Sequence, residues 1–414
     1  PAVAVLPFVT VLAIPLAAVF LHQALSGPAG FEQVAGILDF WLVRLILLVL
    51  AWRLLRHRFG RVHVSFGEPL ALAEFLDARR PGWRAEGDAR ADWVRPLIND
   101  AAGELARRIN AAAVATPVSL VALALLATPK HTADAQALLR QIEHCQALLR
   151  EAPPSPGAAD SDLPAAEIVS YAEGLGFVER LPHPLGELLR VRANAAALLA
   201  YFRNNVLHLF ALPALVACLL GRNRRLDARR MEAAVAGIYP LLRAELFLHS
   251  PVEALPEAMA AVVSVLTARG LMRRNPETGR YAAPEPTSQS FAELRQLGEA
   301  IRPTLERHFL TLALLQRHGA GRLTRRALEE ASHLLAQRLA LLYEFDAPEF
   351  SEKSLFAGFI GHLLDAGILR EDEAGLLEFD ERITVPAAQA ELVLSAEVRQ
   401  TILRMAGETV QEEQ

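Results

Sequence analysis

Hydrophobic and polar positions divide the chain into an apolar leader, one short strand pattern and a long run of helical patterns. Residues 61–69 (RVHVSFGEP) alternate, with Val62, Val64 and Phe66 on one face, and end at a Gly-Glu-Pro break. This pattern predicts a half-buried strand, the last of a sheet, followed by a turn and a short helix. Residues 94–128 then follow one helical pattern, in which Pro117 predicts a break and a domain boundary.

The remaining chain shows weak internal similarity. The segments ALLAT, ACLLG and LALLQ begin at residues 124, 217 and 312, and each is followed by helical patterns and a glycine that leads into a strand pattern. The turn sequences NPETG (275–279) and DEAG (372–375) predict hairpins. Helices followed by a small hairpin describe a winged-helix-like unit. The alternative is that helices rich in alanine and leucine resemble one another by chance.

The leader allows three interpretations. Residues 1–31 contain no Asp, Glu, Lys or Arg. Residues 3–25 and 36–52 are long enough for a membrane hairpin, although Asp39 and Arg44 are unfavourable inside a bilayer. Because only two of 42 basic residues are lysine, the gene is of a GC-rich type, and a frame-shifted leader is the second interpretation. A buried apolar segment is the third.

Composition limits the classes of function. The chain of 414 residues is 52% hydrophobic and 21% charged, with a net charge of −5. No global basic field favours nucleic acid, and we expect no nucleic-acid partner. Cys145 and Cys218 lie in apolar helical patterns without the spacing of metal ligands, which favours a reduced cytoplasmic setting and no metal site.

Candidate chemistry is sparse. The chain lacks the nucleophile-elbow, phosphate-loop, zinc-protease and dinucleotide-binding motifs. His63 and Glu68 have the spacing of an H-x-x-x-x-D pair, but they belong to a strand that ends in a turn, so we do not interpret them as catalytic. In residues 200–213 (AYFRNNVLHLFALP) a polar group interrupts an apolar helix, and we expect a structural network or, alternatively, an anion or partner site; its members are Arg203, Asn204, Asn205 and His208. Arg243 and Glu245 lie in a second such stretch, and we expect a structural role for them.

Several blocks together resemble one enzyme family. In this order they are VHVSFGEPL, ELARRINAAAVATPVSLVALALLAT, YFRNNVLHLFALPAL, IYPLLRAELFL and DAPEFSEKSLF. They look like the C-terminal half of bacterial glycerol-3-phosphate 1-O-acyltransferase, over about residues 59–405. The resemblance implies acyl transfer from acyl–acyl-carrier-protein or acyl-CoA to sn-glycerol 3-phosphate, in phospholipid (CDP-diacylglycerol) synthesis. It also implies a location at the cytoplasmic face of the bacterial inner membrane, contact with membrane lipid, and no redox or metal cofactor.

The family's catalytic motifs, the H-x-x-x-x-D pair and the arginine-containing phosphate motifs, match nothing in this sequence. No catalytic or substrate-binding residue is therefore assigned, and the chain as given is expected to be inactive. Only Phe66, Gly67, Glu68 and Pro69 match the end of the acyltransferase domain, as a structural edge.

The resulting expectation is a mainly α chain whose helical region is preceded by the edge of an α/β acyltransferase domain. We divide it into a leader (1–58), the end of that domain with a connecting helix (59–117), and a C-terminal helical region (118–414) of three units, 118–195, 196–290 and 291–414. The alternative function is a non-catalytic scaffold or regulatory module of winged-helix type.

Overall fold

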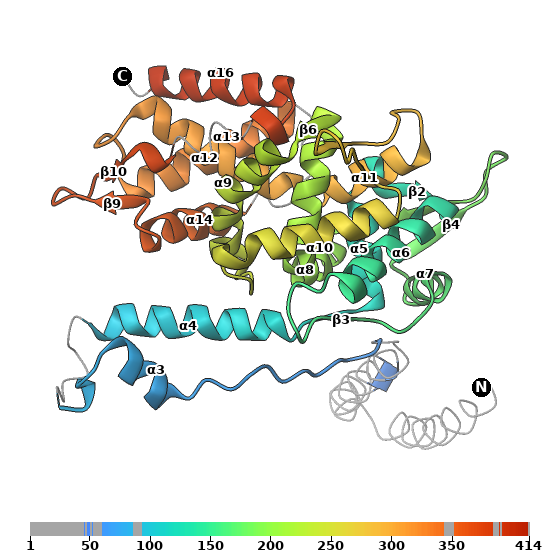
Figure 1. The fold of residues 1–414 in the computed structure, drawn as a ribbon, viewed down its shortest axis with the longest axis horizontal. Coiled ribbons are helices and arrows are strands. Elements are labelled where there is room, and N and C mark those ends of the chain that lie inside the picture. The colour runs from blue at the N-terminus through green and yellow to red at the C-terminus, as the bar shows by residue number, and fades with distance from the viewer. Residues whose placement is uncertain are drawn as a thin grey trace, which may run out of the picture. The chain divides into compact units, whose positions relative to one another are not determined.

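The computed structural model describes residues 45, 48, 49, 52, 60–85, 93–342, 352–383, 389 and 391–412. The chain divides into two compact units, Pro1–Arg61 and Val62–Gln414. Most of residues 1–58 lies outside the described residues, so the three interpretations of the leader stay predictions. The second unit consists mainly of helices with small sheets (Figure 1), which confirms the prediction of a mainly α region with small hairpins.

The strand predicted over residues 61–69 does not form among the described residues. Residues 60–71 have no regular secondary structure, and the side chains that should have been half-buried are exposed: Val62 by 84%, Val64 by 74% and Phe66 by 92%. A strand needs a neighbour for its backbone N–H and C=O groups, and no strand among the described residues pairs with this segment. The segment instead contacts a helix, because Arg108 Nη1 donates to the carbonyl of Pro69 at 2.5 Å.

Two helices follow, and the predicted break after them is confirmed. They are α3 (Leu72–Arg79) and α4 (Val94–Ala111), with the short 3-10 helix η2 (Trp83–Ala85) between them. The helical pattern of residues 94–128 is interrupted at 112–116, and α5 starts with Pro117 in its first position. Thr116 caps this helix by accepting a hydrogen bond from the backbone N–H of Ser119 at 3.3 Å.

The first repeat contains three helices and a three-stranded sheet. Its elements are α5 (Pro117–Leu126), β2 (Thr132–Asp134), α6 (Ala135–Glu151), α7 (Ala165–Gly174), β4 (Val178–Leu181) and β5 (Leu188–Val191). The strand order is β2-β5-β4, all antiparallel, so the strand between the first two helices pairs with the last strand of the hairpin. A separate parallel pair joins β1 (Val114–Ala115) to β3 (Ala159–Asp160).

The second repeat has the same order. Its elements are α8 (Ala196–Asn223), β6 (Arg225–Asp227), α9 (Ala228–Leu246), α10 (Leu255–Ala268), β7 (Arg273–Arg274) and β8 (Arg280–Ala282). The sheet order is β6-β8-β7, again antiparallel, which is the arrangement of the first repeat. Residues 275–279 connect β7 to β8, which confirms the hairpin that NPETG predicted.

The third repeat follows one further helix, α11 (Gln289–Glu299). Its elements are α12 (Arg302–His318), α13 (Arg325–Leu342), α14 (Lys353–Asp365), β9 (Leu369–Glu371) and β10 (Leu377–Phe379), and α16 (Ala396–Glu412) comes after them. An isolated bridge between Thr324 and Leu376 replaces the first strand, and β10 pairs with β9. The order of helices, strand position and hairpin therefore occurs three times, which is the winged-helix-like pattern predicted from the sequence.

The same junction recurs in each repeat, where the first strand passes into the second helix. Asp134, Asp227 and Thr324 each accept a hydrogen bond from a backbone N–H in the first turn of that helix, at 3.0, 3.0 and 3.2 Å. A side-chain oxygen at this position satisfies N–H groups that a helix start leaves unpaired, and typically stabilises the helix by about 1 kcal/mol. The repetition of this cap argues that the similarity of the three units is structural rather than compositional.

Helix α8 lies in the core, where it packs against α5 and α11. Phe210 and Leu215 on this helix are fully buried. Among the described residues, α8 is the one helix long and apolar enough to cross a membrane, but 72% of its most apolar stretch is buried within the protein. Burial of this kind is what a core helix requires, so its composition alone is weak support for a membrane span.

Candidate functional site

The four polar residues singled out on α8 (Arg203, Asn204, Asn205 and His208) lie in two different environments. Arg203 is buried, and its Nε and Nη2 donate to Oδ1 of Asn204 at 3.2 and 3.0 Å. Asn204 and Asn205 are exposed. His208 Nε2 lies 3.1 Å from the backbone carbonyl of Asn110 at the end of α4. Arg203 and His208 therefore have different surroundings, and a shared function for the four residues stays a prediction.

The ionisation of these side chains separates them further. Burial, together with the positive charge of Arg307, lowers the pKa of Arg203 to about 10, so the guanidinium stays charged at pH 7. Burial also lowers the pKa of His208 to about 4, although its hydrogen bond to Asn110 opposes this shift. The imidazole is neutral at pH 7, so Nε2–H donates to the carbonyl and fastens α8 to α4.

A second group of polar side chains, here called the buried ion cluster, consists of Glu245, Arg307 and His308. Glu245 lies near the end of α9, and its two carboxylate oxygens accept hydrogen bonds from Arg307 Nη2 and His308 Nε2 of α12. The side chains of the cluster are 4–11% exposed. His308 also stacks on Phe359 of α14, with ring centroids 3.9 Å apart. The cluster therefore joins the second repeat to the third.

The charges within the cluster follow from these contacts. Although burial opposes ionisation, Arg307 and His308 hold the pKa of Glu245 at about 2. Burial lowers the pKa of His308, so its imidazole is neutral at pH 7 and Arg307 is the charged partner of Glu245. Arg307 Nε and His308 Nδ1 have no partner among the described residues. The sequence indicated Glu245 only as a polar interruption, and its partners lie more than 60 positions away.

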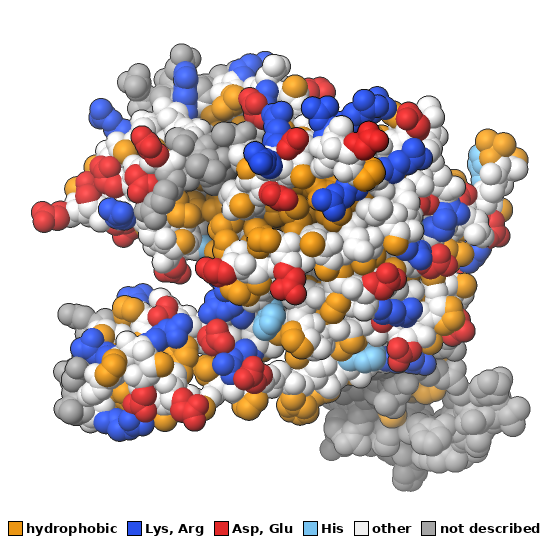
Figure 2. Space-filling model, viewed as in Figure 1, with side chains coloured by type: hydrophobic (Ala, Val, Ile, Leu, Met, Phe, Trp, Pro, Cys, Tyr) orange, Lys and Arg blue, Asp and Glu red, His pale blue; other side chains and the backbone are white. Residues whose placement is uncertain are grey.

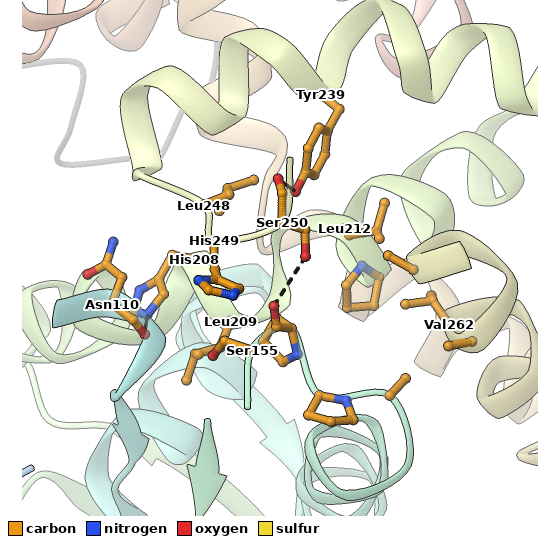
Figure 3. A pocket seen from close by; sticks show the side chains of 16 residues that line it. Asn110, Ser155, His208, Leu209, Leu212, Tyr239, Leu248, His249, Ser250 and Val262 are labelled. Carbon is orange, nitrogen blue, oxygen red and sulfur yellow. Dashed lines mark hydrogen bonds between the residues drawn. The ribbon is translucent and has the colours of Figure 1, made fainter. Parts of the chain in front are cut away.

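A small pocket lies where α4, α8, α9 and α10 meet (Figure 3). Its polar lining residues are Asn110, Ser155, His208, Tyr239, His249 and Ser250, and leucine, proline, alanine and valine side chains complete the wall. Its volume of about 60 Å³ is sufficient for several water molecules or one small group.

Most polar groups of this pocket are already used. The Tyr239 hydroxyl and Arg243 Nε both donate to the carbonyl of Ser250, at 3.0 and 3.1 Å, and Asn110 Nδ2 donates to the carbonyl of Leu246 at 2.8 Å. These bonds hold the connection after α9 against its neighbours. The Arg243 side chain therefore supports a loop, which accords with the structural role expected of it. The hydroxyls of Ser155 and Ser250 donate to the backbone carbonyls of Ala111 and Pro154, at 2.8 and 3.3 Å.

Two further histidine pairs have defined surroundings. His63 and Glu68 are both exposed in the irregular segment, and Glu68 lies 4.0 Å from Arg108 Nη1.

His144 of α6 was not singled out in the sequence, yet it is buried and its Nε2 lies 3.0 Å from Glu293 of α11. Arg269 Nε donates to the other ring nitrogen of His144 at 3.1 Å. This histidine therefore connects three helices, and its partners are 149 and 125 positions away.

Comparison with known proteins decides the family. The model of the glycerol-3-phosphate acyltransferase C-terminal region matches residues 45–372. The chain belongs to this family. The match begins inside the leader, at residue 45, and includes the four polar residues of α8, the buried ion cluster and His144. No group of three or more residues suited to hold a metal ion occurs in the part of the chain that the structure describes.

Curated members of the family are clearly similar. Glycerol-3-phosphate acyltransferase from Ectopseudomonas mendocina (strain ymp) is 38% identical over 356 residues, which cover 85% of this chain and 43% of that protein. The protein of the same name from Pseudomonas aeruginosa (strain UCBPP-PA14) is 38% identical over 363 residues, or 87% of this chain and 43% of that protein. The one from Xylella fastidiosa (strain 9a5c) is 36% identical over 361 residues, or 86% of this chain and 42% of that protein. The chain thus spans less than half the length of these relatives.

Proposed function

We propose that this chain serves as the C-terminal region of an enzyme that transfers an acyl group to the 1-hydroxyl of sn-glycerol 3-phosphate. The family match over residues 45–372 is the observation that carries this proposal. The donor is acyl–acyl-carrier-protein or acyl-CoA. The hydroxyl oxygen attacks the thioester carbonyl, the thiol leaves with the proton, and the product is 1-acyl-sn-glycerol 3-phosphate for phospholipid synthesis. The enzyme works at the cytoplasmic face of the bacterial inner membrane, in contact with lipid.

Within this enzyme the helical region acts as a support and not as the source of the general base. His144 and His308 are buried and His208 is half-buried; burial lowers the pKa of each, and each ring contacts a structural partner. A general base must reach the proton that it removes, so rings already held by structural partners are unsuited to the role. We divide the support into the units 118–195, 196–290 and 291–414, which contain the three repeated sets of elements.

The segment of residues 59–71 joins the support to the catalytic domain. Val62, Val64 and Phe66 are exposed apolar side chains at alternate positions, which is the pattern of a strand that buries one face once it pairs. Phe66, Gly67, Glu68 and Pro69 then form the edge of the acyltransferase sheet. Gly67 is required where the segment crosses α4, because a Cβ there would lie 2.7 Å from the carbonyl oxygen of Arg108.

The alternative function is a non-catalytic winged-helix scaffold, which the three repeats support by topology alone. A winged-helix scaffold that binds nucleic acid needs basic side chains on the helix that enters a groove of the duplex. Helices α7 and α10 hold the third-helix position of the first two repeats and contain no lysine or arginine. In α14 the one lysine, Lys353, pairs with Glu330, and the helix contains no arginine. We therefore favour the acyltransferase.

A domain exchange tests the proposal. The matched region of the Pseudomonas aeruginosa relative is replaced by residues 60–406 of this chain, and the chimera is assayed for glycerol-3-phosphate acylation with acyl–acyl-carrier-protein and acyl-CoA. We expect activity from the chimera and none from this chain alone. A chimera that accumulates in the membrane, resists proteolysis like the parent and yet is inactive would contradict the proposal.

The junction is tested in the same chimera. Val64→Glu with Phe66→Glu should abolish activity, because these side chains would be buried in the catalytic sheet. Leu185→Glu is the matched control, since Leu185 is an apolar side chain 91% exposed at the hairpin between β4 and β5, and it should leave activity intact. Equal activity of the two variants would contradict the strand role of residues 62–66.

A further inference from the structure

The second repeat carries a basic surface formed by arginines that lie far apart in the sequence. Arginines from the end of α8, the start of α9 and the β7–β8 hairpin gather around the sheet β6-β8-β7. We call this the arginine surface and define it by six exposed side chains: Arg224, Arg225, Arg229, Arg273, Arg274 and Arg280. Figure 2 shows Lys and Arg side chains concentrated in this part of the molecule, at the upper edge of the view. The whole chain has a net charge of −5, so this concentration is local.

Strand register places three of these side chains on one face. Arg225 on β6 and Arg273 on β7 are both paired with Ala282 of the central strand β8, and Arg280 on β8 is paired with Asp227. Directly paired residues of neighbouring antiparallel strands point to the same side of a sheet. Neighbouring strands lie about 4.8 Å apart, so Arg225 and Arg273 project about 10 Å from each other with the small Ala282 between them.

Few carboxylates compensate these charges. Asp227 accepts the capping hydrogen bond from the Arg229 N–H, and Glu285 lies 3.7 Å from Arg224 with its own side chain 79% exposed. Glu277 lies at the exposed hairpin turn. Arg229 also sits in the first turn of α9, which contains no acidic residue, although the positive end of a helix disfavours cations there. Arg225, Arg229, Arg273 and Arg280 form no ion pair among the described residues.

The other two repeats provide an internal comparison. In the first repeat, arginines on the β4–β5 hairpin are paired: Arg180 with Glu173 and Glu187, at 2.9 and 2.5 Å, and Arg190 with Glu179 at 2.5 Å. In the third, the β9–β10 hairpin contains acidic residues at five positions: Glu371, Asp372, Glu373, Glu378 and Asp380. The same backbone therefore accommodates neutral and acidic surfaces, so the fold does not require the uncompensated arginines of the second repeat.

We propose that the arginine surface is the docking site for an acidic carrier protein that brings the acyl chain as a thioester. This inference rests on the proposed function, which supplies such a donor. Charge complementarity favours an acidic protein surface. A lipid surface is disfavoured because stable membrane attachment needs apolar insertion as well as charge, and no large hydrophobic side chain is exposed among residues 202–251 or 253–333. A nucleic-acid duplex is disfavoured because α10, the third helix of this repeat, lacks basic residues.

Direct binding tests the inference without any need for acyl transfer. The 414-residue chain is titrated with fluorescently labelled holo acyl carrier protein at low salt and at 0.5 M salt. We expect saturable binding that the higher salt weakens, since a contact dominated by exposed charges is screened. The variant Arg225→Glu, Arg273→Glu, Arg280→Glu should bind at least tenfold more weakly. All three side chains are exposed, so circular dichroism and thermal unfolding should match those of the parent.

The control reverses the same number of charges elsewhere. Arg317→Glu, Arg322→Glu, Arg326→Glu changes three exposed arginines at the end of α12 and the start of α13. It should bind the carrier within twofold of the parent. Absence of carrier binding by the parent, or equal losses in the two variants, would overturn the inference. So would binding of phosphatidylglycerol vesicles or of a 20-base-pair duplex that the first variant loses while carrier binding persists. An inactive chimera with normal carrier binding would instead count against the proposed function alone.

Discussion

Replacing Glu245 with glutamine removes the carboxylate of the buried ion cluster and leaves Arg307 enclosed without its counter-charge. The Arg307 side chain is 4% exposed, and that of Glu245 is 11% exposed. The change keeps the size of the side chain, so the main effect is electrostatic. Arg203, whose pKa is lowered by burial and by Arg307, shares the same surroundings, which makes a second uncompensated positive charge less tolerable.

Two routes give the same magnitude. Moving the pKa of Glu245 from 4.5 to about 2 corresponds to about 3 kcal/mol of stability at pH 7. Removing one partner of a buried ion pair typically costs about 3–5 kcal/mol. The folded-state pKa is depressed, so this stability is fully present above about pH 5 and is lost as the pH falls towards 2.

The measurement is urea unfolding at pH 7 of Glu245→Gln, Arg307→Met and the double variant. We expect each single change to lower the free energy of unfolding by about 3 kcal/mol. The double variant should lose much less than the sum, because it leaves neither charge behind, with a coupling of about 2 kcal/mol. The cost of Glu245→Gln should also shrink as the pH is lowered from 5 to 3. Additive losses, or a cost that does not change with pH, would refute the argument.

Three further predictions follow from packing and ionisation. Gly298→Ala should destabilise the protein by about 2 kcal/mol, because its Cβ would lie 2.7 Å from the backbone nitrogen of Cys218. Gly358→Ala has open space around it in α14 and should be neutral or stabilising. Thermal unfolding of both variants checks this, and equal shifts in the unfolding temperature would contradict it. Burial raises the pKa of the Cys145 and Cys218 thiols to about 12, so Ellman's reagent should modify them only after unfolding, and rapid native reaction would be inconsistent with their burial. Burial raises the pKa of Glu306 to about 7, although the positive charge of Arg302 opposes this shift. Glu306→Gln should therefore raise the free energy of unfolding at pH 8 by up to about 3 kcal/mol and leave it unchanged at pH 4. Urea unfolding at both pH values tests this, and a loss of stability at pH 8 would show that the ion pair with Arg302 dominates.

The local sequence predicted features that depend on neighbouring residues. The break at Pro117, the hairpin at residues 275–279 and the order of helices within each repeat arise from backbone preferences and short-range hydrogen bonds. The strand predicted over residues 61–69 does not form among the described residues, because a strand exists only when another strand satisfies its backbone. The alternation of Val62, Val64 and Phe66 gives the segment one apolar face, but it does not determine which other element buries that face.

Features formed by distant residues could not be predicted in the same way. Glu245 and Arg307 are 62 positions apart, and Arg225 and Arg273 meet only because both strands pair with β8. In the sequence the helix that begins at residue 228 mixes both signs of charge, and it does not resemble a basic surface. The position of each charge became informative once the strand register was known. A repeat is therefore recognisable from its local pattern, while the chemistry of its surface depends on the pairing of its strands.

The distribution of buried and exposed polar groups bears on the role proposed for this region. Three histidines whose pKa burial lowers hold helices together; His144 and His308 are buried and His208 is half-buried. Two exposed features, the apolar row at residues 62–66 and the arginine surface, are suited to contacts with other protein surfaces rather than to bond making. Changes on the arginine surface of the chimera should therefore raise the KM for the carrier-bound donor and leave kcat nearly unchanged. With acyl-CoA as donor the same variants should show normal KM values, because no carrier protein docks in that reaction. A fall in kcat with both donors would mean that the surface supports the catalytic domain itself.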